Sequence, residues 1–286
     1  MQRAATAVLT DPSLSKGYCF LVDATPISTV GVGVARTPTP GSTAYPTTIL
    51  APTEEQSREF GEDSVMSDLL MGAAREAVAS ASRHLAESGL VIGTAGNISA
   101  REGDLIAVTP TGADLATVTA EMVTIIDLEG GHVDGDLAPT SEVPLHTGIY
   151  AATNALAITH AHAMASTALS CCHDELPPLH YSCLGLGGAP RTAPYATFGT
   201  PELAQNVIKA LEGRNAAMMQ NHGSIAYGST MDQAVERLEL LEWLAELYWR
   251  SSSMGTPRVL TDKDFEDIIV AATTGRYGVM RKIEKS

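Results

Sequence analysis

The feature that most constrains the fold is the regular alternation of helix-like and strand-like segments after about residue 63. Helical patterns such as residues 201–213 (PELAQNVIKALEG) run between short apolar stretches such as residues 154–164 (NALAITHAHAM). An amphipathic helix must bury its apolar face against another element, and a sheet offers a flat apolar partner. The alternation therefore predicts one domain in which helices pack on a β-sheet.

Periodicity and glycine positions predict individual elements. Residues 66–90 have apolar residues at four-residue steps, including Ala73 and Ala77, and Gly89 is predicted to end this helix. Residues 122–135 read as a hairpin with two glycines at its turn.

Caps and turns follow from residue type in the same way. Ser141 is predicted to cap a helix in which Pro144 lies in the first turn, and Thr200 is predicted to cap another. Two further strands are predicted to meet at a turn formed by His222 and Gly223.

The first 63 residues differ in composition from the rest of the chain. They contain six of the 15 prolines, together with many Thr, Ser and Ala residues and no periodic apolar pattern. Such a segment buries little surface, so residues 1–63 are predicted to be a low-complexity, poorly ordered extension. Residues 64–286 are predicted to form the folded domain.

Charge and cysteine content exclude several classes of protein. The chain has 18 Lys plus Arg against 33 Asp plus Glu, a formal charge of −15. An acidic chain repels nucleic acid and anionic membranes, so neither is an expected partner. The four cysteines form no C-x-x-C pair, which favours reduced thiols and a cytoplasmic location. No apolar run is long enough to predict a membrane span.

Two histidines lie at the end of an apolar strand-like run, residues 158–162 (ITHAH). Residues two apart in a strand point to the same face, so His160 and His162 are placed to bind one metal ion. For this pair alone, the alternative of two polar residues at a strand end weighs equally. His222 shifts the balance, because it also follows an apolar strand, and Gly223 permits a turn of positive φ with close approach of backbone. Three imidazoles with one open position are typical of a catalytic zinc site.

Three short stretches have the character of an anion site: residues 93–97 (GTAGN), 109–112 (TPTG) and 139–142 (PTSE). They offer hydroxyls, an Asn amide and backbone N–H groups, and they contain no Lys or Arg. Each alone reads more simply as a tight turn, so only their combination suggests an uncharged phosphate cradle.

Glu142 is the natural acid/base beside these groups, although a glutamate that favours the positive end of a helix is the plainer interpretation. His146, one helical turn later, either supports such a site or is structural. His84 falls in a helix and is expected to face solvent.

Six motifs in one order resemble those of the class II aldolase/adducin family, and most closely its L-fuculose-1-phosphate aldolase branch. They are GTAGNIS, TPTG, PTSE, HAH, APYATFGT and NHG, within a resemblance that extends from about residue 66 to the C-terminus. The resemblance implies an α/β fold, a three-layer α/β/α sandwich with a mixed, mostly antiparallel central sheet. It also implies a homotetramer with active sites at subunit interfaces.

The resemblance further implies roles for individual residues. His160, His162 and His222 match the ligands of one Zn²⁺ per subunit, with another divalent metal as the alternative. Glu142 matches the catalytic acid/base, and Tyr181 and Tyr277 match two tyrosines that act near the substrate, Tyr181 across the interface. The positions that match phosphate-binding residues are Thr94, Asn97, Thr111, Gly112, Thr140 and Ser141.

The implied activity is a zinc-dependent aldolase that reversibly cleaves a ketose 1-phosphate to dihydroxyacetone phosphate and an aldehyde. The alternatives are a sugar-phosphate epimerase, dehydratase or decarboxylase of the same family, or a non-catalytic adducin-like interaction module. Epimerases tend to carry Asp in place of Glu142, and an adducin-like module is expected to lack the histidine set. The identity of the aldehyde is not predicted.

Overall fold

The computed structural model describes residues 69–274. By contacts the chain divides into Met1–Thr53 and Glu54–Ser286, and all described residues belong to the second unit. The extension predicted over residues 1–63 lies outside the described residues, as does Tyr277.

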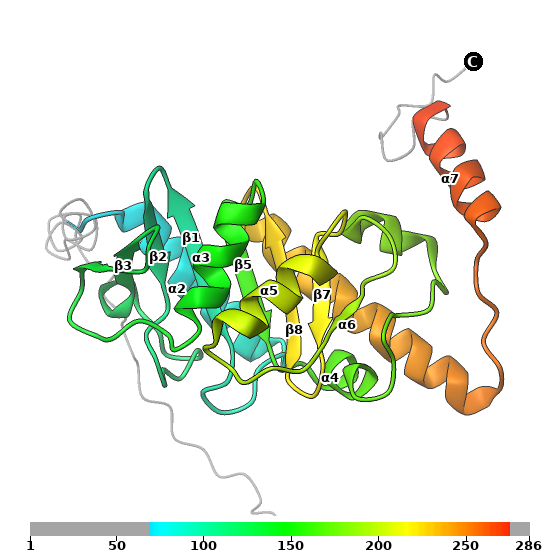
Figure 1. The fold of residues 1–286 in the computed structure, drawn as a ribbon, viewed down its shortest axis with the longest axis horizontal. Coiled ribbons are helices and arrows are strands. Elements are labelled where there is room, and N and C mark those ends of the chain that lie inside the picture. Colours follow the sequence, from blue (N-terminus) through cyan, green and yellow to red (C-terminus); the bar gives the residue numbers. More distant parts are fainter. Residues whose placement is uncertain (1–68, 275–286) are drawn as a thin grey trace, which may run out of the picture. The chain divides into compact units, whose positions relative to one another are not determined.

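An eight-stranded sheet forms the centre of the domain (Figure 1). Its strands, in spatial order, are β4 (His132–Asp134), β3 (Thr124–Asp127), β2 (Leu105–Val108), β1 (Asn97–Glu102), β5 (Ala157–Ala161), β8 (Gly223–Gly228), β7 (Ala216–Met219) and β6 (Thr192–Ala193). All neighbouring strands pair antiparallel except β6 and β7, which are parallel. The predicted mixed, mostly antiparallel sheet is confirmed.

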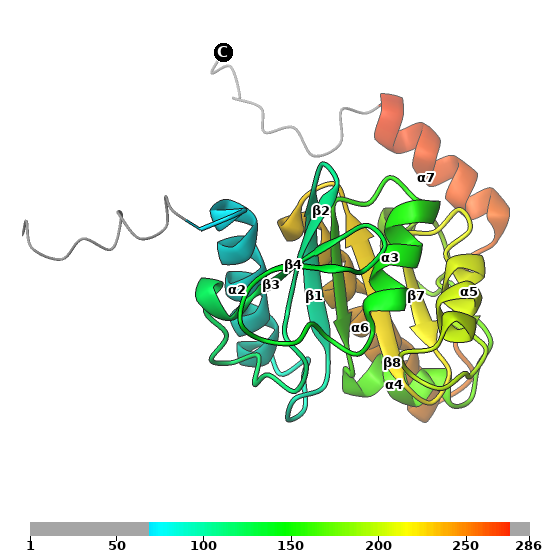
Figure 2. The same ribbon diagram turned by 60° about the vertical axis from the view of Figure 1, so that its left-hand side comes forward.

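Helices cover both faces of this sheet, which makes the predicted three layers (Figures 1 and 2). On one face lie α3 (Val143–Ala152) and α5 (Pro201–Ala210), and on the other lie α2 (Gly72–Glu87), α4 (Met164–Ser170) and α6 (Met231–Met254). The remaining helical elements are η2 (Ala120–Met122), η3 (Tyr181–Leu186) and α7 (Asp262–Thr274). Among residues 69–274, no helix is both long and apolar enough to cross a membrane.

Successive side chains of the central strands pack alternately into two cores, because helices cover both faces of the sheet. In β7, Ala216 and Met218 pack in the core beneath α2, α4 and α6, while Ala217 and Met219 pack in the core beneath α3 and α5. Strands buried on both faces read as continuous apolar runs, which explains the unbroken AAMM and AIT segments.

The four-residue step through Ala73 and Ala77 does not mark the buried face of α2. Ala73 is exposed and Ala77 is only half-buried, whereas the buried side runs through Val78 and Leu85. Alanine has little surface to bury, so the larger residues decide which face packs on the sheet. The predicted stop is confirmed, since α2 ends just before Gly89.

Of the two predicted N-cap residues, Thr200 caps its helix and Ser141 does not. Thr200 caps α5 by accepting a hydrogen bond from the Leu203 N–H at 3.3 Å, as predicted. Ser141 does not cap α3; Glu142 occupies the cap position and makes no side-chain capping bond. Its carboxylate contacts His160 instead of the free N–H groups at the start of the helix.

The turn between β7 and β8 also differs from the prediction. The residue with positive φ is Asn221, at 56°, whereas Gly223 is already the first residue of β8. Gly223 is required for close approach: a Cβ there would lie 2.5 Å from the Ala161 carbonyl oxygen. The glycine therefore lets the turn that carries His222 lie against the end of β5.

Strand pairing brings the predicted metal ligands together at the C-terminal end of β5, in the middle of the sheet. β5 lies between β1 and β8, with Asn97 opposite His160 and Ser224 opposite Ala161. Gly96, just before β1, has φ of 98°, and a Cβ there would lie 2.8 Å from the His160 carbonyl oxygen. Three chain segments therefore meet within backbone contact where the predicted ligands lie.

The close approach at Gly96 is testable by adding one methyl group. We expect Gly96→Ala to lower the free energy of unfolding by roughly 1–3 kcal/mol more than Gly93→Ala, measured by urea unfolding. Gly93 is the matched control, because it also has positive φ, 57°, but nothing lies within 4 Å of its added Cβ. Equal losses in the two variants would show that left-handed strain alone, and not the backbone contact, makes Gly96 necessary.

Candidate active site

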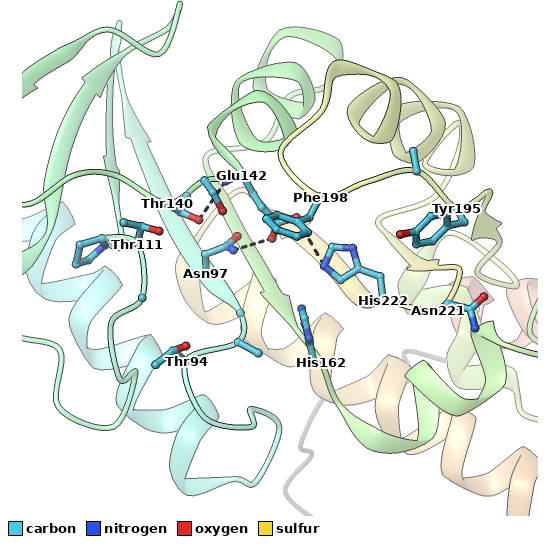
Figure 3. Close-up of a pocket in the computed structure, with 16 residues that line it drawn as sticks. Thr94, Asn97, Thr111, Thr140, Glu142, His162, Tyr195, Phe198, Asn221 and His222 are labelled. Atoms are coloured by element: carbon cyan, nitrogen blue, oxygen red, sulfur yellow. Dashed lines mark hydrogen bonds and ion pairs between the residues drawn. The ribbon is translucent and has the colours of Figure 1, made fainter. Parts of the chain in front are cut away.

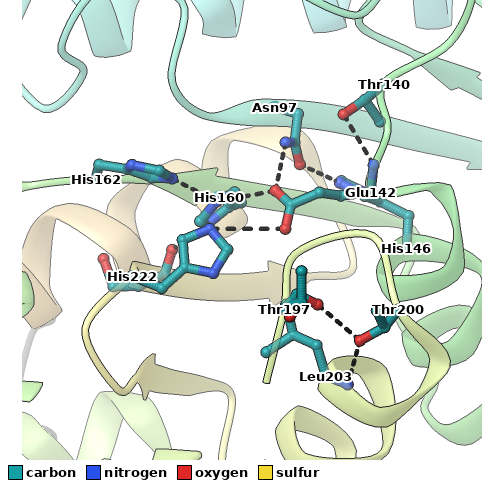
Figure 4. Close-up of polar contacts among 11 residues, drawn as sticks. Asn97, Thr140, Glu142, His146, His160, His162, Thr197, Thr200, Leu203 and His222 are labelled. Carbon is teal, nitrogen blue, oxygen red and sulfur yellow. Dashed lines mark hydrogen bonds and ion pairs between the residues drawn. The ribbon is translucent and has the colours of Figure 1, made fainter. Parts of the chain in front are cut away.

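Three imidazoles converge at the end of the central strand, as the H-x-H spacing and His222 predict (Figure 4). One ring nitrogen from each of His160, His162 and His222 lies within 4.8 Å of the others. The Nε2 atoms of His160 and His162 are 3.2 Å apart. Two nitrogens that bind one tetrahedral zinc ion at about 2.0–2.1 Å would be separated by roughly 3.4 Å.

A hydrogen bond from Nδ1 to the backbone holds the His160 ring in one orientation. The residue is fully buried, and its Nδ1–H donates to the Ser224 carbonyl oxygen at 2.8 Å. This bond leaves Nε2 directed at the other two rings, which is the usual arrangement of a metal-binding histidine supported by a backbone carbonyl.

Burial keeps the other two imidazoles neutral near pH 7. It lowers the pKa of His162 to about 4, with the neighbouring rings of His160 and His222 acting in the same direction. Burial and His160 together lower the pKa of His222 to about 4. A neutral imidazole keeps a lone pair, so both rings are ready to bind a cation at neutral pH.

Glu142 completes the cluster from the start of α3. Its Oε2 lies 3.2 Å from His160 Nε2 and accepts a hydrogen bond from Asn97 Nδ2 at 2.8 Å. Burial alone would raise its pKa, but the charge and hydrogen bond of His160, with the bond from Asn97, hold the pKa well below its usual range. The side chain is therefore a carboxylate at neutral pH, available as a base.

One oxygen atom of this carboxylate is evidence that the cluster is suited to a metal ion. Glu142 Oε1 is buried and accepts no hydrogen bond from any described residue, although His222 Nε2 lies 3.7 Å away. A buried, unpaired carboxylate oxygen is costly unless a further partner satisfies it. Three imidazole nitrogens beside it form a donor set suited to zinc and to several other transition metals.

The cluster opens into a cavity of about 490 Å³ (Figure 3). His162, His222 and Glu142 line it, while His160 lies beneath its floor. The six predicted phosphate-binding positions all line the same cavity: Thr94, Asn97, Thr111, Gly112, Thr140 and Ser141. Within the described chain, no Lys or Arg contributes to this wall, as the three Gly/Thr-rich stretches predict.

Aromatic residues that were not predicted as site residues form another part of the wall. Tyr195 and Phe198 line the cavity and are 59% and 63% exposed (Figure 3). Asn221 lines it too, from the β7–β8 turn. The available signal was the pair of aromatic residues in the loop segment 193–200 (APYATFGT), where Pro and Gly leave large side chains without a core position.

Of the two predicted tyrosines, the structure describes Tyr181, which is not among the residues that line this cavity. Tyr181 lies on η3, is 43% exposed and stacks on His180 with ring centroids 4.4 Å apart. Tyr277 falls outside the described residues. Among the described residues, the cavity of a single chain is thus lined by His162, His222, Glu142 and the six predicted phosphate-binding positions, and not by Tyr181.

Comparison with known proteins identifies the fold. Residues 76–249 match the family model described as Class II Aldolase and Adducin N-terminal domain. The chain belongs to the class II aldolase/adducin family. It is a class II aldolase, and thus a lyase.

Relatives of this aldolase cover most of its folded part. It is 37% identical over 199 residues to the 5-methylthioribulose-1-phosphate/5-deoxyribulose-1-phosphate aldolase of Rhodospirillum rubrum, covering 69% of this chain and 90% of that protein. It is 38% identical over 194 residues to the L-fuculose phosphate aldolase of Escherichia coli K12, covering 67% and 89%. A solved L-fuculose 1-phosphate aldolase superposes with a TM-score of 0.68 and 32% identity, covering 73% of this chain and 99% of that one.

We expect the aldolase to bind about one divalent metal ion per chain through its three imidazoles. His160→Ala and His162→Ala should each lose the ion, because two imidazoles with one carboxylate leave an incomplete, poorly oriented ligand set. Metal content after dialysis, measured by mass spectrometry, checks this. His84→Ala is the control, since His84 is exposed and pairs with Glu239 outside the cavity. Unchanged metal content in His160→Ala would contradict the assignment.

Proposed function

We propose that this class II aldolase is zinc-dependent and reversibly cleaves a ketose 1-phosphate to dihydroxyacetone phosphate and an aldehyde. One observation carries the proposal: three imidazoles and a buried carboxylate share a cavity with an uncharged, hydroxyl-rich wall. This combination offers a metal site, a proton-transfer group and an anion site around one cavity.

We assign the metal to His160, His162 and His222. A bound zinc ion supplies Lewis-acid stabilisation of the negative charge that develops on the substrate oxygens when the carbon–carbon bond breaks. The chain's contribution is to hold three imidazoles in place: Ser224 orients His160, and burial keeps His162 and His222 unprotonated at neutral pH.

Glu142 is the proposed acid/base at carbon. Its low pKa makes it a carboxylate, so in the direction of synthesis it removes a proton from the carbon beside the carbonyl. In the direction of cleavage the same group returns the proton to carbon. The Oε1 atom is suited to this role because it accepts no hydrogen bond from described residues, whereas Asn97 holds Oε2.

The proposed phosphate site uses neutral donors only. Thr94, Asn97 and Thr111 present hydroxyls and an amide to the cavity, and Gly112, Thr140 and Ser141 bring backbone N–H groups or hydroxyls near the start of α3. Aligned N–H groups and a helix N-terminus bind a dianion without Lys or Arg. An uncharged cradle beside a cation suits a substrate in which phosphate and carbonyl lie one carbon apart.

The far end of the substrate is proposed to lie against Tyr195 and Phe198. These exposed aromatic side chains offer an apolar surface, which suits a neutral aldehyde. The named relatives include aldolases for fuculose phosphate and for methylthioribulose or deoxyribulose phosphates, so the proposal names the class of ketose 1-phosphate and no single member.

We further propose a homotetramer with active sites at subunit interfaces. Tyr181 is exposed and does not line the cavity of its own chain, as expected of a side chain that reaches a neighbouring copy. Tyr181 of a neighbouring copy, or Tyr277, is then the proposed group for the proton on the aldehyde oxygen. The catalytic domain is proposed to span residues 64–286, and the free thiols of Cys171, Cys172 and Cys183 favour the cytoplasm.

Catalysis by Glu142 predicts a large effect of a small change. Glu142→Gln should lower kcat about 10²- to 10⁴-fold, because an amide cannot transfer the proton at carbon. The assay measures dihydroxyacetone phosphate released from fuculose 1-phosphate, 5-deoxyribulose 1-phosphate and methylthioribulose 1-phosphate. Glu129→Gln is the control, since Glu129 is exposed in the β3–β4 hairpin. Dihydroxyacetone phosphate from none of these substrates would overturn the proposed activity.

The phosphate assignment predicts an effect on substrate binding. Thr111→Val keeps the shape of the side chain but removes its hydroxyl, so KM should rise roughly 10- to 100-fold, as for a hydrogen bond to a charged group. Thr117→Val is the matched control, because Thr117 is exposed and does not line the cavity. Steady-state kinetics on the same ketose phosphate distinguish the two, and equal KM values would contradict a role for Thr111.

A further inference from the structure

A chain of buried polar side chains begins at Glu142 and continues through Asn97 and His146, the three members that Figure 4 shows, and the proposed mechanism leaves most of it unused. His146, on α3, contacts Asn97 Oδ1 through Nε2 at 2.6 Å and Ser99 Oγ through Nδ1 at 2.7 Å. Ser99 Oγ in turn lies 2.8 Å from the Tyr150 hydroxyl. The chain therefore runs from Tyr150 to Asn97, and Asn97 contacts the carboxylate of Glu142.

These groups have little access to water. His146 and Ser99 are fully buried, Tyr150 is 2% exposed and Asn97 is 6% exposed. Buried polar groups must find their hydrogen-bond partners inside the protein, so each contact has to pair one donor with one acceptor.

This requirement fixes the direction of every bond in the chain. Glu142 Oε2 only accepts, so Asn97 must present Nδ2 to it and is left with Oδ1 toward His146. Oδ1 also only accepts, so His146 Nε2 must carry a hydrogen.

The donors and acceptors beyond His146, at Ser99 and Tyr150, are fixed in the same way. In a neutral ring with Nε2–H, Nδ1 is an acceptor, and Ser99 must donate to it. The Ser99 oxygen then accepts from the Tyr150 hydroxyl. Burial lowers the pKa of His146 to about 4 and raises the pKa of Tyr150, so the ring stays neutral and the phenol stays protonated.

We propose that His146, in its Nε2–H tautomer, is a positioning residue that holds the Asn97 amide in the orientation that donates to Glu142. The inference deepens the proposed function, since it rests on Glu142 as the acid/base. Without the Nε2–H group, the contact with Glu142 is the one member of this chain of contacts that distinguishes the two ends of the Asn97 amide, whereas with it both ends are specified. A flipped amide would place an oxygen 2.8 Å from the carboxylate oxygen, where two acceptors repel each other.

The orientation of the Asn97 amide also determines which polar group it presents to the cavity. Asn97 Nδ2 carries two hydrogens, of which Glu142 takes one, and Asn97 lines the cavity. The amide orientation set by His146 therefore leaves a donor, and not an acceptor, for an anionic substrate.

The first test measures the tautomer directly on the metal-loaded protein. In protein labelled with ¹⁵N-histidine, long-range proton–nitrogen NMR at pH 7 should show His146 with a protonated Nε2 and an unprotonated Nδ1. The His146→Gln spectrum assigns the signals by their disappearance. A His146 ring with its hydrogen on Nδ1, or with hydrogens on both nitrogens, would overturn the proposal.

The second test compares two variants at the same position. His146→Gln retains an amide N–H that reaches Asn97, whereas His146→Leu fills similar volume without a donor. We expect His146→Leu to lower kcat roughly 10- to 100-fold at unchanged zinc content, and His146→Gln to recover most of that loss. Equal kcat in His146→Leu and wild type, or an equal loss in both variants, would overturn a positioning role.

The experiments distinguish a failure of the proposed aldolase activity from a failure of the proposed role of His146. If the wild-type protein releases no dihydroxyacetone phosphate from any ketose phosphate, the proposed function is overturned. The NMR tautomer, which requires no turnover, still confirms or overturns the orientation of Asn97 by His146. It also decides the matter if His146→Leu fails to fold.

Discussion

The site depends on backbone contact between three segments at one end of β5. Gly96 packs against the His160 carbonyl and Gly223 against the Ala161 carbonyl, and neither contact leaves room for a Cβ. Because β1 and β8 flank β5, this contact brings Asn97 and the His222 turn to His160, in β5, and to His162, which directly follows β5. A site built on paired strands is held more rigidly than one built on loops, which suits a metal centre that tolerates little displacement.

The electrostatics follow from that contact. A buried carboxylate and buried imidazoles are each costly alone, and here they offset one another, with His160 and Asn97 stabilising the charge of Glu142. A protein of net charge −15 gains no general attraction for an anionic substrate. The positive potential must then be local, and in the proposed mechanism it comes from the neutral cradle at the start of α3 together with a cation on the imidazoles.

Features that depend on neighbouring residues could be predicted from the sequence. The H-x-H spacing in a strand, the Thr200 cap with Pro201, and the Gly/Thr-rich strand ends are local patterns, and each lies where it was predicted. Features that depend on competition between distant groups were predicted less well. Ser141 lost the cap position because Glu142 turns toward His160, and positive φ fell on Asn221 because Gly223 was needed for contact with β5.

By itself, the sequence determined the alternation of elements, the clustering of imidazole side chains, the acidic net charge of the chain and the absence of Lys and Arg from the predicted anion site, because residue type and short spacing decide these properties. Only the tertiary structure decided that β5 lies between β1 and β8, that Glu142 keeps one unpaired oxygen, and that Tyr195 and Phe198 line the cavity. The buried chain from Tyr150 to Glu142 belongs to the same group. It joins β1 to α3, segments more than 40 residues apart in sequence, and only packing against the sheet brings them within hydrogen-bond distance.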